Sequence, residues 1–241
     1  MLARHRALRA KLCAAIAPDQ SKKEMAVTGL TERLEKLYVS AVHDVMRGKG
    51  LSNFVLPRDI RPLEEGKKLA GPIFTVEGKS GTDFDEHETL LGWTGVLSKS
   101  PTGHVVICQP NNDTVALMGE LSAEALKLKG VIGYIADGGM RDCEFILDMN
   151  FPVWGRFRTP NDIVARWLPT AFNETIKIGD VAIAGGDWVL GDRDGIIIIP
   201  QADIEDIIAE TERVVSLENM VRTSILTGMD PQEAYLKHRK F

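Results

Sequence analysis

The sequence has 241 residues, of which 44% are hydrophobic and 26% charged, and these values are those of an ordinary globular protein. No run of about 18 apolar residues is present that could span a bilayer, so we expect no membrane partner. The formal net charge of −5 argues against nucleic acid as a partner, because phosphates are bound by clustered Lys and Arg.

The first 17 residues carry no acidic residue and four basic ones, Arg4, Arg6, Arg9 and Lys11. Transit peptides have such a charge pattern, but they are rich in serine and this stretch has none. We favour the alternative, a basic amphipathic helix that extends the fold. Residues 1–27 are therefore taken as an N-terminal helical extension.

Apolar residues at steps of three and four predict an amphipathic helix over 30–49, which ends at Gly48 and Gly50. An extended connection follows, and the apolar run 68–76 predicts a strand. Residues 83–98 are expected to be helical, with acidic residues at the N-terminus where the helix dipole favours them. The acidic cluster 85–88 could hold a metal, but adjacent acids at a helix start usually face solvent.

A strand–helix–strand unit is predicted next, from strand 104–108 through helix 119–130 to strand 131–136. Beyond it we expect a short helix, a strand at 152–155 and an irregular stretch through Pro169. Three short β-rich runs follow, separated by Gly-Asp and Asp-Gly turns. They cover 176–183, 188–190 and 196–199, and a helix over 202–226 completes the predicted elements.

The three cysteines are odd in number and widely spaced: Cys13, Cys108 and Cys143. This usage predicts neither a disulfide framework nor a thiolate zinc site. It fits a reducing compartment, and we expect a cytoplasmic protein.

The candidate chemical centre is the segment 137–142, Asp-Gly-Gly-Met-Arg-Asp, at the end of a buried strand. We expect Gly138 and Gly139 to allow a tight turn there. Glu120 precedes Arg141 by one helix and one strand, so both can lie at the same edge of the sheet. The first amides of the helix that starts at Gly119 have no intrahelical acceptor and can bind an anion. Carboxylates suit Mg²⁺ or Mn²⁺, and an arginine pairs with a carboxylate ligand.

Taken alone, this pattern is more often an ordinary strand-to-helix turn with a surface ion pair. The segments 119–121 and 130–142, however, resemble the signature of the RraA-like family, which includes 4-hydroxy-4-methyl-2-oxoglutarate aldolases with oxaloacetate decarboxylase activity. Residues 69–76 look like the first core strand of that family, and 186–196 like its late hairpin.

The resemblance covers roughly residues 30–228 and implies the architecture. We expect an α/β protein whose layered β/β/α swivelling domain occupies 28–228, with N- and C-terminal helices and a C-terminal tail over 229–241. It also implies a homotrimer or a homohexamer.

The resemblance assigns roles to residues of this sequence. Asp142 would be the direct ligand of Mg²⁺ or Mn²⁺, and Arg141 would hold the carboxylate or keto oxygen of the substrate. The amides of Leu121 and Ser122, after Gly119, would bind the pyruvyl end. Glu120 would organise metal-bound water and assist catalysis, and Glu218 would do so from a neighbouring subunit. The best-known aldolases have Asp at the position of Glu120, which leaves the substrate open.

The predicted function is a class II, metal-dependent carbon–carbon lyase that acts on a 2-keto acid. Retro-aldol cleavage of a 4-hydroxy-2-oxo acid and oxaloacetate decarboxylation both release pyruvate through an enolate. A lysine Schiff base is the rival chemistry, but Lys127 and Lys129 are predicted to be solvated. The alternative function is a non-catalytic regulator that binds a ribonuclease or helicase. Such family members tend to lack the acid and Arg-Asp set that is intact here. A phosphate-handling domain is less favoured, because the loop motifs contain no histidine.

Overall fold

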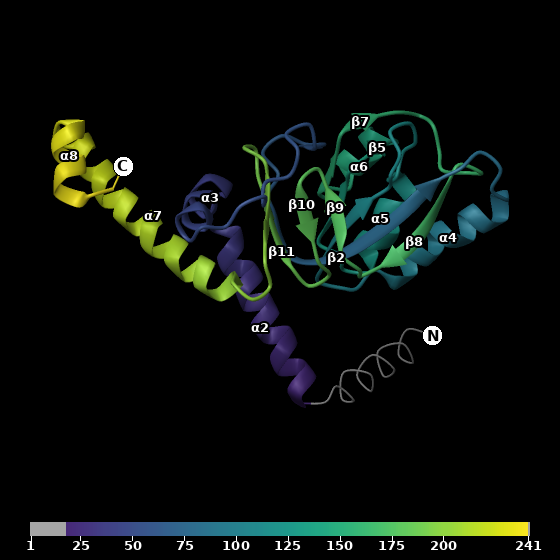
Figure 1. Cartoon of the computed structure of the whole chain (residues 1–241), viewed down its shortest axis with the longest axis horizontal. Coiled ribbons are helices and arrows are strands. Elements are labelled where there is room, and N and C mark those ends of the chain that lie inside the picture. Colours follow the sequence, from purple (N-terminus) through teal and green to yellow (C-terminus); the bar gives the residue numbers. More distant parts are fainter. Residues whose placement is uncertain (1–17, 241) are drawn as a thin grey trace.

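The structure is a computed structural model that describes residues 18–240 (Figure 1). The predictions for the basic N-terminal stretch and for Cys13 lie outside the described residues. None of the described helices is long and apolar enough to cross a membrane.

An eight-stranded sheet forms the centre of the fold. Four parallel strands lie side by side in the order β6, β4, β3 and β2. Antiparallel strands flank them: β1 at one edge, and β8, β11 and β12 at the other. The strands are β1 (Arg61–Pro62), β2 (Leu69–Ser80), β3 (Val105–Gln109), β4 (Gly133–Ala136), β6 (Val153–Gly155), β8 (Trp167–Phe172), β11 (Trp188–Gly191) and β12 (Ile196–Ile199).

Two layers cover the faces of this sheet (Figure 1). Helices α4 (Glu86–Lys99), α5 (Glu120–Leu128) and α6 (Cys143–Asp148) pack on one face. The hairpin of β9 (Ile176–Ile178) and β10 (Val181–Ile183) packs on the other. A short parallel pair, β5 (Gly139–Met140) and β7 (Phe157–Arg158), lies near the helices.

A third core lies between β11–β12 and the terminal helices α2 (Pro18–Glu35), α3 (Val39–Gly48) and α7 (Ile204–Leu226). Helix α8 (Pro231–His238) follows α7 and packs against it at the far end of the molecule (Figure 1).

Alternation of side chains explains why the strands are apolar at nearly every position. Along β3, Val106 and Cys108 pack toward the helices, while Val105 and Ile107 pack toward the hairpin. The isoleucines of β12 alternate in the same way between the hairpin core and the terminal-helix core. Strands that are buried on both faces read as continuous apolar runs. The predicted layered α/β fold with N- and C-terminal helices is confirmed.

The prediction of one continuous helix over 30–49 was wrong, because the chain breaks between α2 and α3. The Asp192 carboxylate accepts a hydrogen bond from the amide of Val39, the first residue of α3, at 2.9 Å. Lys68 Nζ donates to the carbonyls of Glu35 and Leu37 across the break. These partners are distant in sequence, so helical periodicity alone could not reveal the break.

The stretch expected to be irregular contains β8, which pairs with the outer half of β2. Pro169 lacks an amide hydrogen, and it lies opposite Gly78 where the register of the ladder shifts. The indole of Trp167 lies against Gly78, where a Cβ atom would be 2.0 Å from the ring. A proline in a strand is tolerated here because the bulge removes the need for its missing donor.

Candidate functional site

Apart from Glu218, the predicted site residues meet at the carboxyl ends of two neighbouring parallel strands. Helix α5 begins after the loop that follows β3, and Arg141-Asp142 follow β4 and β5. The amide of Glu120 donates to Asp142 Oδ2 at 3.1 Å. The Arg141 amide donates to the Met118 carbonyl at 2.9 Å, which fixes the two segments side by side. The structure therefore brings Glu120 and Arg141-Asp142 together.

Gly119 allows this close approach because it has no side chain. Its backbone is extended, with φ −145° and ψ −179°, which any residue can adopt. A Cβ atom at this position would lie 2.6 Å from Asp142 Oδ2 and 3.2 Å from Arg141 Nε. The glycine thus provides space for the two side chains at the N-terminus of α5.

Asp142 has a left-handed backbone, with φ 54° and ψ 36°, which is uncommon for a residue other than glycine. It is the N-cap residue of α6, yet its side chain makes no capping hydrogen bond there. The carboxylate instead accepts a hydrogen bond from the amide of Glu120, the first residue of the preceding helix, α5. Six other described residues besides glycine also have a positive φ, and Asp adopts this conformation more readily than most residues, so the hydrogen bond from Glu120 is what places the carboxylate.

Arg141 lies between two carboxylates. Its Nε is 3.5 Å from Asp142 Oδ2, and its Nη1 is 3.9 Å from Asp162 Oδ2. All three side chains are about two-fifths exposed, so these contacts are weak and leave the guanidinium available to a ligand.

Asp162 is a site residue that the sequence analysis missed. Its loop is held against the site because the Ala116 amide donates to the Asn161 carbonyl, and the Thr159 amide to the Met140 carbonyl. Asp162 also accepts the Val164 amide at 3.1 Å. No local pattern signals this role, since turn-forming residues around Pro160 are typical of any loop.

These residues line a pocket of about 380 Å³, here called the Arg141 pocket. Helix α4 forms one wall, residues 116 and 118–122 a second, and Arg141, Asp142 and 162–164 the rest. Ser122 lies within it, and its hydroxyl accepts a hydrogen bond from Trp93 Nε1 at 2.8 Å. The volume is within the range of small-molecule sites.

Asp137 does not belong to this pocket, although the sequence analysis placed it at the start of the chemical centre. Arg156 donates to the carboxylates of both Asp137 and Asp59. Burial raises the pKa of Asp137, and the neighbouring guanidinium acts in the opposite direction. Its side chain is only 19% exposed, so it serves as an internal ion-pair partner.

The chain bends at Asp137 and Gly138, between β4 and β5, as expected, but the bend does not use a left-handed glycine backbone. Neither Gly138 nor Gly139 has a positive φ. A Cβ atom on Gly139 would lie 2.6 Å from the Phe157 ring and 2.7 Å from the Val115 carbonyl oxygen. A Cβ atom on Gly138 would be 3.0 Å from Pro110. Close packing, rather than a left-handed backbone, therefore accounts for the two glycines.

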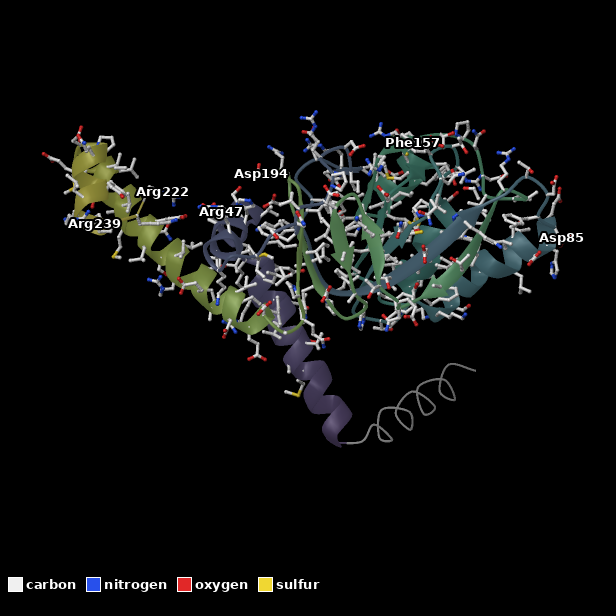
Figure 2. All side chains as sticks on the ribbon, viewed as in Figure 1. Arg47, Asp85, Phe157, Asp194, Arg222 and Arg239 are labelled. Atoms are coloured by element: carbon white, nitrogen blue, oxygen red, sulfur yellow. The ribbon has the colours of Figure 1, made fainter. Side chains whose placement is uncertain are left out.

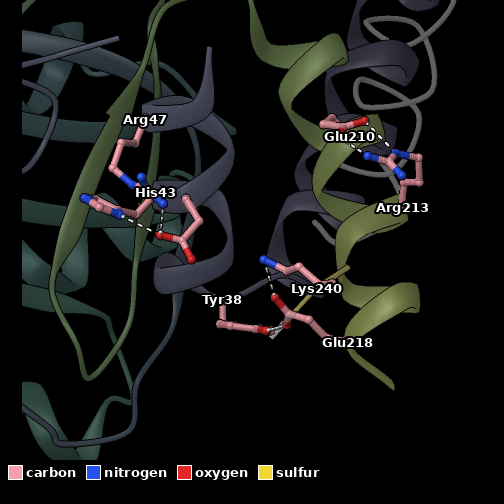
Figure 3. A network of polar contacts seen from close by, with 8 residues as sticks. Tyr38, His43, Arg47, Glu210, Arg213, Glu218 and Lys240 are labelled. Atoms are coloured by element: carbon pink, nitrogen blue, oxygen red, sulfur yellow. Dashed lines mark hydrogen bonds and ion pairs between the residues drawn. The ribbon is translucent and has the colours of Figure 1, made fainter. Parts of the chain in front are cut away.

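Glu218 lies outside the Arg141 pocket of its own chain. Glu218 is on α7, whereas the pocket is lined by α4. In Figure 2, Arg222 of α7 and Asp85, the N-cap of α4, lie at opposite ends of the molecule. Its carboxylate accepts a hydrogen bond from the Tyr38 hydroxyl and forms an ion pair with Lys240 at 3.2 Å (Figure 3).

The residues of the pocket fit a hard divalent cation that keeps several water ligands. Asp142 and Glu120 provide carboxylate oxygens, and Mg²⁺ commonly binds through one or two carboxylates with water in its other positions. Within the part of the chain that the structure describes, no group of three or more His, Cys, Asp or Glu could enclose a metal. In the acidic cluster 85–88, Asp85 caps α4 by accepting the Glu88 amide at 2.9 Å.

A larger pocket of about 760 Å³ lies between α3 and α7. Its charges are already paired: Arg213 with Glu210 at 2.6 Å, and Arg47 with Asp44 at 3.5 Å (Figure 3). The smaller Arg141 pocket is the better candidate for a functional site, because a helix N-terminus, a guanidinium and three carboxylates line it.

Comparisons with known proteins agree with one another. The model of the RraA-like family, described as Aldolase/RraA, matches residues 39–198. A candidate 4-hydroxy-4-methyl-2-oxoglutarate aldolase of Halalkalibacterium halodurans is 28% identical over 191 residues, which cover 78% of this chain and 85% of that protein.

Two solved structures have a similar fold. One, described as novel cellulases from microbes associated with the gut ecosystem, is 34% identical with a TM-score of 0.76, covering 80% of this chain and 86% of its own. RraAS2 of Streptomyces coelicolor, described as an unusual member of the RNase ES inhibitor RraA protein family, is 22% identical with a TM-score of 0.72. It covers 81% of this chain and 97% of its own.

Proposed function

The chain belongs to the RraA-like family, and from that premise we propose that it is a divalent-metal-dependent carbon–carbon lyase acting on a 2-keto acid. One observation carries the proposal. The N-terminus of α5, the Arg141 guanidinium and the Asp142 carboxylate line the same pocket, with Asp142 Oδ2 3.1 Å from the Glu120 amide. The proposed reactions are retro-aldol cleavage of a 4-hydroxy-2-oxo acid and decarboxylation of oxaloacetate, each releasing pyruvate.

Binding of the keto acid uses groups that have no strong partner among residues 18–240. Leu121 and Ser122 are in the first turn of α5, where backbone amides lack intrahelical acceptors. These amides and the helix dipole suit the carboxylate of the pyruvyl end. The guanidinium of Arg141 can then face the keto oxygen.

Asp142 would hold Mg²⁺ or Mn²⁺, with Glu120 close by and water as the remaining ligands. When bound, the cation supplies a Lewis acid that polarises the keto group. The hydrogen bond from the Glu120 amide holds the Asp142 carboxylate at the N-terminus of α5, so this carboxylate is positioned before the substrate binds.

Retro-aldol cleavage breaks the bond between C3 and C4 of the substrate, and its electron pair moves into the keto group to give the enolate of pyruvate. The proton of the 4-hydroxyl is released, and a proton is added to C3. Arg141 stabilises the negative charge of the enolate. Glu120 moves the proton through a water molecule. Loss of carbon dioxide from oxaloacetate forms the same enolate, so one site serves both reactions.

Schiff-base chemistry is disfavoured by where the lysines lie. Lys127 and Lys129 project away from the pocket and donate to backbone carbonyls, Lys127 to that of Met149 and Lys129 to those of Leu97 and Ser98. No lysine lines the Arg141 pocket among the residues that the structure describes.

We also propose a homotrimer or homohexamer in which Glu218 of one subunit organises water at the site of the neighbouring subunit. The family domain would occupy residues 28–228, between an N-terminal extension over 1–27 and a C-terminal tail over 229–241. Glu218 lies far from the pocket of its own chain, so it can act only across a subunit boundary. Sedimentation tests this: a fully active monomer would exclude it.

The experiment on function measures pyruvate release from oxaloacetate and 4-hydroxy-2-oxo acids with Mg²⁺ or Mn²⁺. We expect chelator to abolish release and Arg141→Ala to lower kcat/KM by about 100-fold or more. Arg47→Ala is the control, because the Arg47 side chain is 67% exposed and forms its ion pair with Asp44 of the same helix, α3. A cellulose oligosaccharide serves as a comparison substrate.

Activity that survives chelation would exclude the metal-dependent mechanism. If no keto acid is cleaved and a pull-down retains a ribonuclease or helicase, the chain is a regulator instead of an enzyme.

A further inference from the structure

The charges that line the Arg141 pocket are unequal. Arg141 is the only Lys, Arg or His among the described lining residues, whereas Glu120, Asp142 and Asp162 supply three carboxylates. Arg141 is itself within 4 Å of two of them. With a divalent cation bound, the charges of these lining residues and the cation sum to zero, so a second carboxylate on the substrate would have to find its partner on the remaining wall, α4.

The wall formed by α4 offers a substrate no hydrogen-bond donor. Leu90, Trp93, Thr94 and Leu97 line the pocket over two turns of α4, or about 10 Å at roughly 1.5 Å per residue. The indole N–H of Trp93 is already donated to Ser122. The Thr94 hydroxyl donates to the carbonyls of Leu90 and Leu91 at 2.9 and 3.1 Å.

An uncharged chain fits this wall, while a carboxylate does not. A carboxylate accepts hydrogen bonds only, so this wall offers it nothing in place of the water molecules that it loses on contact with the apolar side chains. A hydroxyl can donate to the Thr94 oxygen, which keeps a lone pair, and a methyl group can contact the two leucines.

We infer that the substrate of the retro-aldol reaction is a 2-keto acid with a single carboxylate, whose far end is an uncharged alkyl or hydroxyalkyl chain. This inference rests on the proposed function and narrows it. The pyruvyl carboxylate binds at the N-terminus of α5, Arg141 faces the keto oxygen, and the uncharged end lies along α4. The relative named for 4-hydroxy-4-methyl-2-oxoglutarate acts, by that name, on a substrate with two carboxylates, so this chain differs from it in substrate class.

Two five-carbon substrates test the inference, because they differ only at the far end. In 4-hydroxy-2-oxopentanoate this end is a methyl group, and the products are pyruvate and acetaldehyde. In 4-hydroxy-2-oxoglutarate it is a carboxylate, and the products are pyruvate and glyoxylate. We expect kcat/KM for the pentanoate to exceed that for the glutarate by about tenfold or more.

A charge-reversal variant removes the effect of intrinsic reactivity. Leu90→Lys places a cation on the α4 wall, and Leu91→Lys is the matched control because Leu91 lines a different groove, beside Pro169. Both leucines are well exposed, at 48% and 63%, so lysine is tolerated at either position. Leu90→Lys should shift the kcat/KM ratio toward the glutarate by about tenfold, and Leu91→Lys should leave it unchanged.

The outcomes separate the two proposals. If pyruvate is released neither from these two substrates nor from oxaloacetate, the proposed function is wrong and this inference fails with it. Release from both with the glutarate equal or preferred overturns the substrate class and leaves the lyase intact. If Leu90→Lys changes the kcat/KM ratio of the two substrates no more than Leu91→Lys does, the α4 wall does not contact the far end of the substrate. This result too overturns the inference.

Discussion

Replacement of Gly119 by alanine should disable the site while leaving the fold intact. The backbone at Gly119 is extended, so alanine adopts it without conformational strain. The added Cβ atom, however, would lie 2.6 Å from Asp142 Oδ2, where ordinary contact begins at 3.4 Å. The carboxylate must therefore move by about 0.8 Å, and the neighbouring Arg141 side chain must also yield.

The size of the effect follows from this displacement. A misplacement of about 1 Å in a catalytic group can reduce the rate by about 100-fold. We expect kcat/KM for pyruvate release to fall by roughly 30- to 100-fold, equivalent to about 2–2.7 kcal/mol. Alanine is also a poorer N-cap than glycine, so the free energy of unfolding should fall by about 1 kcal/mol.

The assay couples pyruvate release to lactate dehydrogenase at saturating Mn²⁺, with urea unfolding measured on the same preparations. Gly95→Ala is the matched control, because Gly95 lies within α4 and a Cβ atom there would contact nothing within 4 Å. It should retain full activity and gain about 0.5–1 kcal/mol of stability. A folded Gly119→Ala variant with kcat/KM within about threefold of the wild type would refute the reasoning.

Two further predictions concern charge. Asp162→Asn removes one of the three pocket carboxylates but keeps the oxygen that accepts the Val164 amide. The KM for oxaloacetate should therefore fall a few-fold at low salt and by less at high salt. A rise in KM would show instead that Asp162 positions Arg141. Burial, together with the hydrogen bond to Glu218, raises the pKa of Tyr38 to about 12. A raised pKa stabilises the fold fully below the ordinary value of about 10, and this contribution is lost as pH rises through about 12. From about pH 8 to about pH 11, the free energy of unfolding measured in urea should therefore fall more for the wild type than for Tyr38→Phe. An equal fall in both proteins would contradict the raised pKa of Tyr38.

Local pattern was sufficient where an element is defined by its own residues. The apolar run before Asp137 predicted a buried strand, and the helix formers after Gly119 predicted α5, because burial on both faces and helical propensity are local properties. Their order along the chain then placed Glu120 and Arg141 at one sheet edge, which the structure also does.

Features that depend on distant contacts were not predictable in this way. Asp162 reaches Arg141 only because its loop bonds to two other segments, and Asp137 is drawn away from the pocket by Arg156 and Asp59. The break before Val39 depends on Asp192. In each case a partner from elsewhere in the chain decides the outcome, and sequence spacing carries no record of it.

Strand β2 also determines when this protein can fold during its synthesis. Its first residues pair with β11, so that Leu69 lies opposite Gly191, and its last residues pair with β8. A ribosome must therefore release nearly the whole domain before β2 acquires both neighbours. Pairings this distant in sequence slow folding, and a nascent chain stalled before β11 would expose the edge of β2 to other chains. Occupancy by a chaperone should accordingly be greatest just before residues 188–199 emerge.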